Sequence, residues 1–419
     1  MKAEILCVGT EILLGDIVNT NAVFLAQELA RLGISVYHQS VVGDNSQRLK
    51  YCLRHSLEQS DLVVTTGGLG PTYDDLTKET VAELFGLDME LHEESLHDIH
   101  AYFEKIGRPM TDNNKKQAMM PKGAVVLKND NGTAPGVIVE GKGKTVILLP
   151  GPPREMKPMF LNGVLPYLRR YTQGTLVSHT VHVFGMGEAQ VESLLRERME
   201  SLSNPTVAPY AKEGEMLLRI TAKAKSSEEA DAMISPLIQE ICDLLGDHVY
   251  GIDVGSLQTA VVRALCDHHL HLATAESCTG GLISKRITEV AGSSQVFDCG
   301  VCSYANKITH QILGVSEETL DRFGAVSPET AAQMAAGVRR LAGADIGIST
   351  TGIAGPGGGT PEKPVGLVYI GVDSPWYQEV LKVNLSRGFP DERELIRWLA
   401  ASNALYLVLQ TIRKYAGKN

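Results

Sequence analysis

The sequence predicts an α/β protein with three parts: an N-terminal parallel-sheet domain, a small α+β middle module and a C-terminal α/β domain. The first observation is that short apolar runs alternate with amphipathic helical patterns over residues 1–171. The second is a change to alternating, half-buried strands over 172–254, and the third is the return of the α/β rhythm over 255–419. A chain of 419 residues also exceeds one ordinary domain.

In the first domain the pattern runs strand, helix, strand, helix, strand. The expected strands are residues 4–8, 35–42 and 62–66, and the expected helices are 20–32 and 47–57. This order predicts a parallel sheet with helices on both faces. Because ligands of such sheets bind beyond the carboxyl ends of the strands, the loops that follow these strands are the first candidates for a site.

The middle module predicts an antiparallel sheet with strands at 179–183 and 216–222 and helices at 188–199 and 228–245. It carries no constellation of catalytic side chains, which favours a linker or dimerisation role. The last domain opens with a helix at 257–268. Its expected strands are 271–275, 295–304, 346–351, 366–372 and 379–383, and its closing helix is expected at 392–415.

Composition argues against several classes of function. The net charge of −10 disfavours broad nucleic-acid binding, which needs a basic face. The N-terminus enters a strand at once, so no signal peptide is expected, and no apolar run approaches the roughly 18 residues of a membrane helix. The seven cysteines are scattered, as expected of reduced thiols in a cytoplasm. The lone Cys299–Cys302 pair lies in a buried strand pattern, which favours packing over a redox or metal role.

Residues 65–77 form the most informative loop of the chain, because they follow an apolar strand and use far more glycine than a turn needs. Gly67, Gly68 and Gly70 let the backbone come close to a ligand, since no Cβ stands in the way. Free N–H groups in such a loop can hold phosphate.

The same loop continues into two adjacent carboxylates, Asp74 and Asp75. Carboxylates here can hold a divalent cation or position a water molecule. A phosphate cradle beside paired carboxylates suggests nucleotide chemistry. The alternative is a simple strand-to-helix turn in which Asp75 serves as the helix N-cap.

Two further loops are expected at the same edge of the sheet. Gly9 and Glu11 follow the first strand, and Gly151 and Glu155 follow a strand expected at 145–149. Since carboxyl ends of neighbouring parallel strands lie together, the three loops are predicted to converge on one site. The glycines would hold phosphate, with the two glutamates as polar neighbours.

The last domain carries a serine where a strand meets a helix. There the hydroxyl of Ser277 can be exposed, and backbone N–H groups of the first helical turn can stabilise an oxyanion. The alternative is that Ser277 is only the N-cap. A Gly-rich segment at 350–360 either encloses a phosphate or sugar or is a plain connection, and Tyr304 is either a proton relay or a half-exposed strand aromatic. A nucleophilic serine also needs a base, for which Lys307 and His310 are the nearby candidates.

Five motifs occur in one order along the chain. They are Gly-Thr-Glu-Ile-Leu-Leu-Gly-Asp at 9–16, Thr-Thr-Gly-Gly-Leu-Gly-Pro-Thr-Tyr-Asp-Asp-Leu-Thr at 65–77, Pro-Gly-Pro-Pro-Arg-Glu-Met at 150–156, Ala-Glu-Ser-Cys-Thr-Gly-Gly at 275–281 and Thr-Gly-Ile-Ala-Gly-Pro at 351–356. Together they resemble the CinA family, the competence/damage-inducible protein A family of bacteria, across essentially the whole chain. The first portion resembles the molybdopterin-binding fold of the MoaB and MogA type. The last resembles stand-alone amidases that deamidate nicotinamide mononucleotide.

The resemblance implies two activities in pyridine-nucleotide recycling. An N-terminal ADP-ribose pyrophosphatase would use a divalent metal and potassium, and a C-terminal deamidase would convert nicotinamide mononucleotide to nicotinate mononucleotide and ammonia. Asp74 and Asp75 are the expected metal ligands. The resemblance also implies a homodimer. On the amidase side it assigns the chemistry to Ser277 and Tyr304 and substrate binding to Thr279, Gly280, Gly281, Thr351, Gly352, Gly355 and an arginine that fits Arg393 or Arg397.

One position departs from the family pattern. Active members usually carry a lysine five residues after the tyrosine, and this chain has Thr309 there. Lys307 comes two residues early, which on a helix turns its side chain through about 200°. A threonine supplies neither the charge nor the basicity of lysine in a Ser-Lys type site. The alternative function is therefore a non-catalytic nucleotide- or pterin-binding scaffold in competence or the response to DNA damage.

Overall fold

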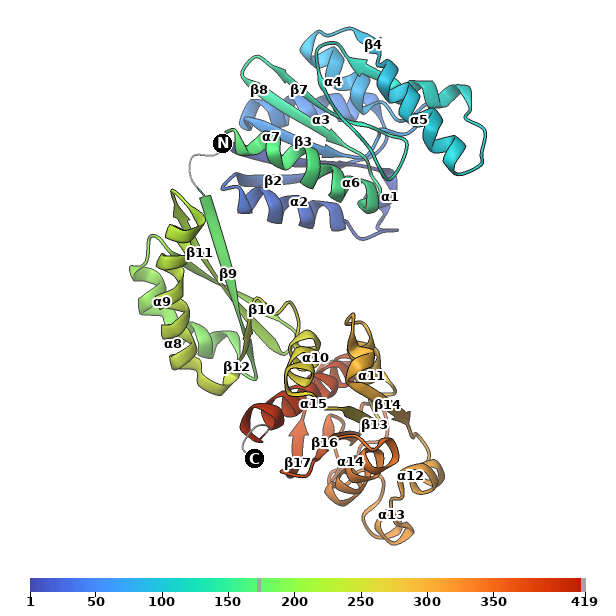
Figure 1. Ribbon diagram of the computed structural model, residues 1–419, viewed down its shortest axis with the longest axis vertical. Helices are drawn as coiled ribbons and strands as arrows, with labels where there is room; N and C mark the ends of the chain where they lie inside the picture. The colour runs from blue at the N-terminus through green and yellow to red at the C-terminus, as the bar shows by residue number, and fades with distance from the viewer. Residues whose placement is uncertain (172–174, 416–419) are drawn as a thin grey trace. The chain divides into compact units, whose positions relative to one another are not determined.

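The computed structural model describes residues 1–171 and 175–415. The boundary expected at residue 172 lies outside the described residues. Contacts group the chain into two compact units. The first holds residues 1–177 and 223–231, and the second holds 178–222 and 232–419. Each unit is mixed α/β (Figure 1), as the sequence predicts.

The first unit is built on a six-stranded sheet of order β2-β1-β3-β8-β7-β6. Strands β1, β2, β3 and β8 are parallel, in agreement with the predicted βαβ rhythm. Strand β7 is antiparallel to β8, and β6 is antiparallel to β7, so the sheet is mixed rather than wholly parallel. The bounds are β1 Lys2–Val8, β2 Ser35–Val42, β3 Leu62–Thr66, β6 Val125–Leu127, β7 Gly136–Gly141 and β8 Lys144–Leu149.

The reversal between β7 and β8 has a local cause. The strands pair from Gly141 opposite Lys144, so only two residues connect them. Both of these residues, Lys142 and Gly143, have positive φ, 53° and 74°. Two left-handed residues in a row make the tight hairpin turn that matches the twist of antiparallel strands, and a parallel crossover would need a dozen residues or more.

Helices cover both faces of this sheet and create two cores. Along β1 successive side chains alternate, so Ile5 and Cys7 enter one core while Leu6 and Val8 enter the other. The first core is closed by α2 Thr20–Arg31, α6 Pro153–Met159 and α7 Leu165–Arg169, and the second by α3 Ser46–Gln59 and α4 Thr77–Phe85. The other elements of this unit are α1 Thr10–Leu14, β4 Met89–Leu91, α5 Glu93–Lys105, η1 Asp112–Ala118, β5 Met119–Pro121 and η2 Phe160–Val164.

The middle of the chain forms a four-stranded sheet of order β10-β11-β9-β12. The pairs β10–β11 and β12–β9 are antiparallel, as the sequence predicts. Its elements are β9 Thr175–Phe184, α8 Glu188–Ser201, β10 Thr206–Lys212, β11 Glu215–Ala224, α9 Ser227–Leu245, η3 Gly246–His248 and β12 Val249–Ile252. Phe184 and Tyr250 belong to the same apolar core as the C-terminal helices, so this module and the C-terminal domain share a core.

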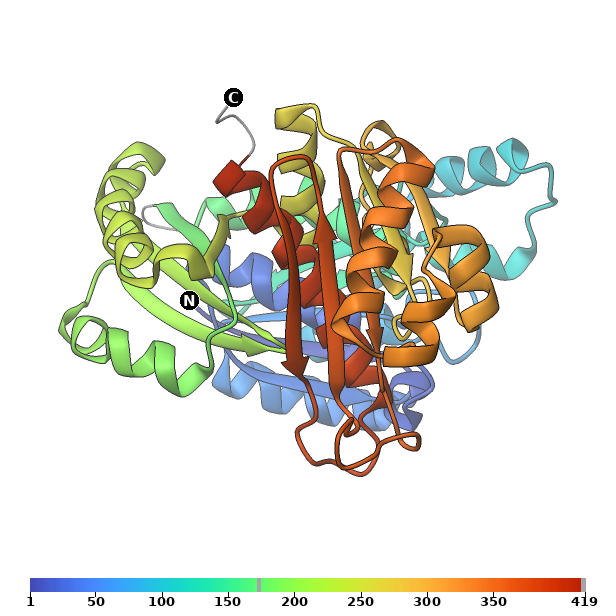
Figure 2. The same cartoon turned by 90° about the horizontal axis from the view of Figure 1, so that it is seen from below.

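The C-terminal sheet has the order β14-β13-β15-β16-β17. Strands β14, β13 and β15 are parallel to one another, and β16 is antiparallel to β15. Strand β17 is antiparallel to β16 in the red hairpin of Figure 2. The strands are β13 Leu272–Glu276, β14 Phe297–Cys302, β15 Ile346–Gly352, β16 Leu367–Asp373 and β17 Gln378–Asn384. On β14 side chains alternate in exposure, and Cys299 and Cys302 are half-buried and exposed respectively. Residues three apart on a strand point to opposite faces, which excludes their joint use as one thiol site.

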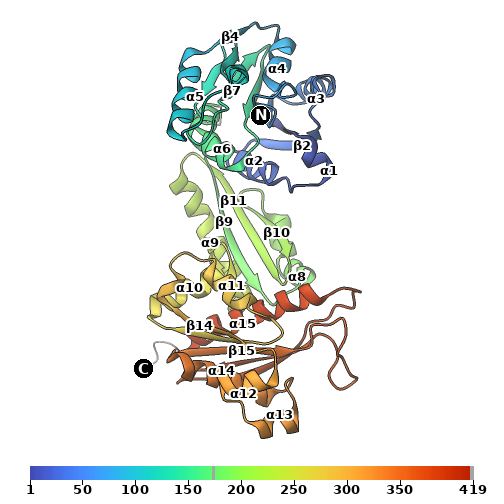
Figure 3. The same ribbon diagram turned by 90° about the vertical axis from the view of Figure 1, so that its right-hand side faces the viewer.

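Helices pack on both faces of the C-terminal sheet (Figure 3). One face carries α10 Leu257–His268, α11 Leu282–Thr288 and α15 Arg393–Tyr415. The other carries α12 Asn306–Leu313, α13 Glu317–Phe323 and α14 Pro328–Ala342, and the short η4 Ser293–Gln295 precedes β14. One described helix, over Arg393–Lys414, is long and apolar enough to cross a membrane, but its apolar window is 67% buried in this core.

Candidate functional sites

The N-terminal site is a cavity of about 400 Å³ at the carboxyl ends of the parallel strands. The three loops predicted to converge do meet here. They follow β1, β3 and β8 and include the predicted residues Gly9, Glu11, Gly67, Gly68, Gly70, Asp74, Asp75, Gly151 and Glu155. The structure adds lining residues from outside these loops, notably Asp44, Gln117 and Thr133.

The glycines of the 65–77 loop are required by the chain's own packing. Gly67 has φ of 106°, and a Cβ on it would lie 2.0 Å from the carbonyl oxygen of Val8. Gly68 has φ of 67°, and its Cβ would lie 2.1 Å from Thr77 Oγ1. The loop therefore packs directly against β1 and the start of α4, and a side chain larger than hydrogen at either glycine would displace it. The glycine signal therefore arises from closure of the loop against β1 and α4 as well as from the cavity.

Asp74 and Asp75 are held together by Thr72. Thr72 Oγ1 donates to Asp74 Oδ1 at 2.5 Å and also to Asp75 Oδ2, which accepts the Thr72 backbone N–H at 3.0 Å as well. The bond from Thr72 is the main reason that the pKa of the Asp74 carboxyl is lowered. Lys116 Nζ donates to the Thr72 carbonyl at 2.7 Å and fixes the turn from the other side. The N-cap of α4 is Leu76, so the interpretation of Asp75 as an N-cap is wrong.

Acidic side chains dominate the lining of this cavity. Its carboxylates are Glu11, Asp44, Asp74, Asp75 and Glu155, and none of the described lining residues is lysine or arginine. Oxygen donors of this kind suit hard divalent cations. No group of three or more His, Cys, Asp or Glu side chains is close enough to hold a metal within the described part of the chain. Asp74 and Asp75 are the pair of adjacent carboxylates in this lining, and a Mg²⁺ ion in proteins takes one or two carboxylates and completes its shell with phosphate and water.

Sequence reasoning missed the residues that hold this site in shape. Asn21 on α2 donates to Thr66 Oγ1 at 2.9 Å and to the carbonyl of Gly151 at 2.7 Å, and so ties the loops after β3 and β8 together. Asn129 Nδ2 donates to Glu155 Oε2 at 2.8 Å and orients that carboxylate, whose side chain is largely buried. Both asparagines lie outside the motifs and act on residues more than twenty positions away in sequence, and no local pattern marks them.

The C-terminal site lies where β13, β14 and β15 end. Backbone hydrogen bonds continue the parallel register past the strands: Ser277 N–H donates to the Thr350 carbonyl, and Ser303 N–H to the Glu276 carbonyl, both at 3.0 Å. This ladder brings Ser277, the approach to Tyr304 and the Thr351–Gly352 end of β15 to one edge. Ser277 is half-buried, and its Oγ has no hydrogen-bond partner among the described residues.

Glu276 organises the loop around Ser277, a role that the sequence did not reveal. Its fully buried carboxylate accepts the backbone N–H groups of Gly281, Ile283 and Ser284 at 2.9 to 3.0 Å. It also accepts the hydroxyls of Thr279 and Ser284, at 2.7 Å each. The first-turn N–H groups of α11 expected to hold an oxyanion are therefore already engaged. The N-cap of α11 is Gly281, so the interpretation of Ser277 as its N-cap is also wrong.

Two arginines from α15 complete the edge. Arg393 Nη1 donates to the Gly355 carbonyl at 2.5 Å, and its Nη2 donates to Tyr304 Oη at 3.3 Å. Arg397 donates to the carbonyls of Cys278 and Thr279, at 3.2 and 2.8 Å. The choice left open between the two arginines therefore resolves into two roles. Arg393 joins the tyrosine to the 351–356 loop, and Arg397 clamps the serine loop.

None of the described residues forms a hydrogen bond with Ser277 Oγ, so no base contacts it in this part of the chain. Thr309 is 6% exposed and its hydroxyl donates back to the Ala305 carbonyl at 3.3 Å. Lys307 is exposed, and His310 Nδ1 contacts the Val315 carbonyl at 2.7 Å at the end of α12. Burial raises the pKa of Cys278 to about 12, so that neighbouring thiol is a poor nucleophile.

Comparison with known families agrees with the three-part organisation. Residues 4–170 match the model of a probable molybdopterin binding domain. Residues 178–251 match the damage-inducible protein CinA KH domain, and residues 254–412 match the CinA C-terminal domain. Fold and sites thus define a multidomain α/β protein that joins a molybdopterin-binding-type domain to a CinA-type domain through a KH-type module.

Full-length relatives give the family. A competence-damage inducible protein of Clostridium acetobutylicum is 52% identical over 397 residues, covering 95% of this chain and 96% of that protein. One of Acetivibrio thermocellus is 49% identical over 417 residues and covers both chains completely. A solved structure of a competence/damage inducible protein from Agrobacterium tumefaciens is 41% identical, covers 39% of this chain and 96% of that one, and has a TM-score of 0.36. The chain belongs to the CinA family.

Proposed function

We propose that the protein is a bifunctional nucleotide hydrolase of pyridine-nucleotide recycling. The N-terminal site would hydrolyse ADP-ribose to AMP and ribose 5-phosphate with a divalent cation and potassium. The C-terminal site would convert nicotinamide mononucleotide and water to nicotinate mononucleotide and ammonia. We further propose a cytoplasmic homodimer, with domains at 1–171, 172–254 and 255–419, that uses neither membrane nor nucleic acid.

The acidic cavity of the N-terminal domain carries this proposal. A pyrophosphate brings negative charge to a site lined by five carboxylates. No described lysine or arginine lines that cavity to neutralise the charge, so binding requires cations from solution. A divalent cation would neutralise the phosphates and lower the pKa of an attacking water molecule.

The chain's own residues would position the reactants. Thr72 holds Asp74 and Asp75 side by side, and Asn129 holds Glu155 with one carboxylate oxygen committed. The free oxygen of Glu155 could orient a water for attack on phosphorus and take its proton. The water oxygen forms a new P–O bond, the bridging P–O bond breaks, and the second phosphate leaves with the bridging oxygen.

The test of the N-terminal activity uses the full-length protein and ADP-ribose. We expect AMP and ribose 5-phosphate with Mg²⁺ or Mn²⁺ and about 100-fold less product from the double variant Asp74→Asn/Asp75→Asn. Asp88→Asn, an exposed aspartate outside the cavity, is the matched control and should act as the wild type. Equal AMP formation without metal, or an undiminished rate in the double variant, would overturn the assignment.

The C-terminal proposal assigns the nucleophile to Ser277. Its Oγ would attack the carboxamide carbon, ammonia would leave, and water would release nicotinate mononucleotide from the acyl-enzyme. Tyr304 and Arg393 would orient the nucleotide from the facing loop. Ammonia release from nicotinamide mononucleotide, compared between the wild type and Ser277→Ala, tests this half. Equal release from the two proteins would remove the deamidase from the proposal.

A second function is favoured by the absence of a base beside Ser277. Thr309 is buried and bonded to its own helix, and Ser277 Oγ lacks a partner within the described residues. A nucleotide- or pterin-binding scaffold acting in competence or the response to DNA damage would need neither a catalytic base nor a bonded serine hydroxyl. Saturable binding of nicotinamide mononucleotide without ammonia release would support the scaffold, whereas release that depends on Ser277 would exclude it.

A further inference from the structure

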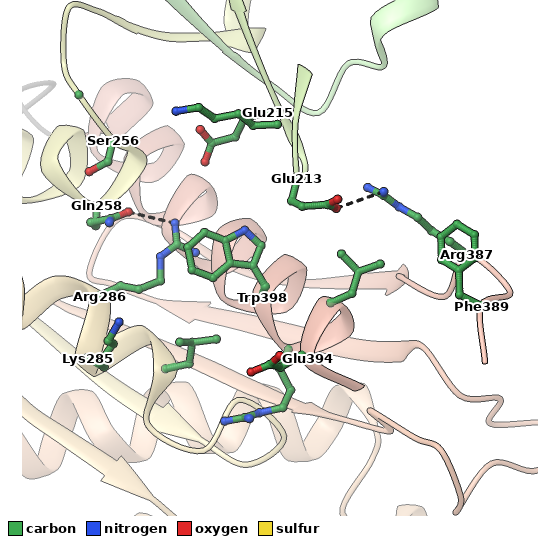
Figure 4. Close-up of a pocket in the computed structure, with 15 residues that line it drawn as sticks. Glu213, Glu215, Ser256, Gln258, Lys285, Arg286, Arg387, Phe389, Glu394 and Trp398 are labelled. Atoms are coloured by element: carbon green, nitrogen blue, oxygen red, sulfur yellow. Dashed lines mark hydrogen bonds and ion pairs between the residues drawn. The ribbon is translucent and has the colours of Figure 1, made fainter. Parts of the chain in front are cut away.

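A second large cavity lies in the C-terminal unit, and of the residues described around Ser277 its lining includes Arg397 alone. It has a volume of about 950 Å³ and is lined by the β10–β11 turn, the start of α10, α11 and α15 (Figure 4). All of its lining residues lie within the second unit. A cavity of this size accommodates a small organic ligand.

A buried arginine and an indole form one wall of this cavity. The Arg286 guanidinium lies 4.1 Å from the centroid of the Trp398 ring, and the Arg286 side chain is 1% exposed. Its Nη1 donates to Ser402 Oγ at 2.7 Å and its Nη2 to Gln258 Oε1 at 3.0 Å, whereas Nε has no partner among the described residues. Burial lowers the pKa of Arg286, because its neutral contacts replace only part of its hydration.

A buried hydrogen-bond chain fixes a carboxylate on the adjacent wall. His182 Nδ1 contacts Tyr250 Oη at 3.0 Å, and Tyr250 Oη donates to Glu215 Oε2 at 2.8 Å. His182 and Tyr250 are both buried, whereas Glu215 lines the cavity. One oxygen of Glu215 is thereby committed, and the other can accept from a ligand N–H or O–H.

The remaining charges make the cavity net positive in a protein that is strongly acidic. Arg387 is paired with Glu213 at 3.2 Å across one rim (Figure 4), and Arg397 is committed to the serine loop. Lys212 lies opposite Glu215 in the β10–β11 register and near His182, and its ammonium makes no hydrogen bond or ion pair among the described residues. The lining holds five cations, Lys212, Lys285, Arg286, Arg387 and Arg397, and three carboxylates, Glu213, Glu215 and Glu394. Lys285 is paired with Glu289 at 2.6 Å beyond the lining, which leaves an excess of one positive charge. In a chain of net charge −10, a local excess of cations favours an anionic ligand.

We propose that this cavity binds a nucleoside phosphate. The base packs against the apolar and aromatic surface around Trp398, a donor on the base or sugar bonds to Glu215, and the phosphate lies near Lys212. This cavity is linked to the Ser277 loop in two ways. Arg397 lines the cavity and also donates to the Cys278 carbonyl of the loop, and α11 begins directly after the loop. The proposal does not depend on either reaction proposed above.

Trp398 provides the signal for a binding test, because the chain has only two tryptophans. In full-length Trp376→Phe protein, Trp398 is the sole indole. We expect AMP to change its fluorescence saturably, with half-saturation below about 1 mM, and adenosine and inorganic phosphate to bind at least about tenfold more weakly. The absence of a saturable change, or equal binding of adenosine and AMP, would overturn the proposal.

Two further variants in the same background locate the binding. Lys212→Glu reverses the charge of the lysine at the rim and should weaken AMP binding about tenfold. Lys382→Glu makes the same change at an exposed lysine on β17 outside the cavity and should have no effect. Equal weakening by the two variants, or no weakening by either, would show that AMP binds elsewhere.

Discussion

The two predicted sites lie at the same place in two sheets and differ in how their charges are met. In the N-terminal cavity several carboxylates face open space with no described cation among them. At the C-terminal edge the polar groups around Ser277 are bonded to one another, from Glu276 to Arg393 and Arg397. Under the function proposed above, the first site would depend on cations from solution, whereas in the second no described side chain is bonded to Ser277 Oγ as a base. The reaction at the first site should therefore depend on dissolved cations, and the reaction at the second site should depend on the protein's own side chains.

Removal of divalent metal should separate the two sites most strongly. With a chelator present, ADP-ribose hydrolysis should fall by about 1,000-fold or more, since nothing else neutralises the pyrophosphate. Ammonia release from nicotinamide mononucleotide, assayed in the same samples, should not change. A parallel loss of both activities would contradict the comparison.

Glu276→Gln should have the largest effect on stability. The amide would place an NH₂ group against backbone N–H donors that now share a carboxylate, at a cost of about 3 kcal/mol in the free energy of unfolding. Urea unfolding followed by circular dichroism measures it. Glu289→Gln, at an exposed pair with Lys285, is the control and should cost less than about 0.5 kcal/mol. Similar losses in both variants would argue against Glu276 as the organiser of the loop.

Thr309→Lys should sharpen the amidase half. If the missing base limits the reaction, a lysine at this position should raise the rate of ammonia release about tenfold. The gain should disappear in the Ser277→Ala background and be absent in Gln311→Lys, an exposed position on the same helix. An unchanged rate in folded Thr309→Lys protein would mean that the base is not the only missing element.

Lys78 gives the smallest predicted effect. Burial lowers the pKa of this lysine to about 8, below its unfolded value of roughly 10.4. Between these values the unfolded chain binds more protons, so stability from this group rises with pH. The melting temperature of Lys78→Met relative to the wild type should therefore fall by a few degrees (about 2–4 °C) from pH 7 to pH 9.5. Lys115→Met, at an exposed lysine, should show no such trend; an equal trend there would exclude Lys78 as its source.

Local patterns were sufficient for the motifs and for part of the elements, whereas α5, β10 and α14 were not predicted. Strands β2 and β3 and helix α10 have the predicted bounds because their apolar spacing and flanking residues agree. The antiparallel edge of the first sheet was missed, because a Lys-Gly turn carries less signal than a glycine-rich loop. The supports Asn21 and Asn129 were missed too, since they act on residues more than twenty positions away.

The sequence by itself determined the order of strands and helices, the placing of motifs at strand ends and the family of the chain. Only the tertiary structure decided how these groups meet. It places Asp75 in a turn rather than at a helix cap, and it brings the Glu276 carboxylate to the backbone N–H groups that follow Ser277. The Ser277 hydroxyl has no hydrogen-bond partner among the described residues. The reason is that propensity acts between neighbours in sequence, whereas hydrogen bonds and charge depend on which distant residues the packed sheets bring together.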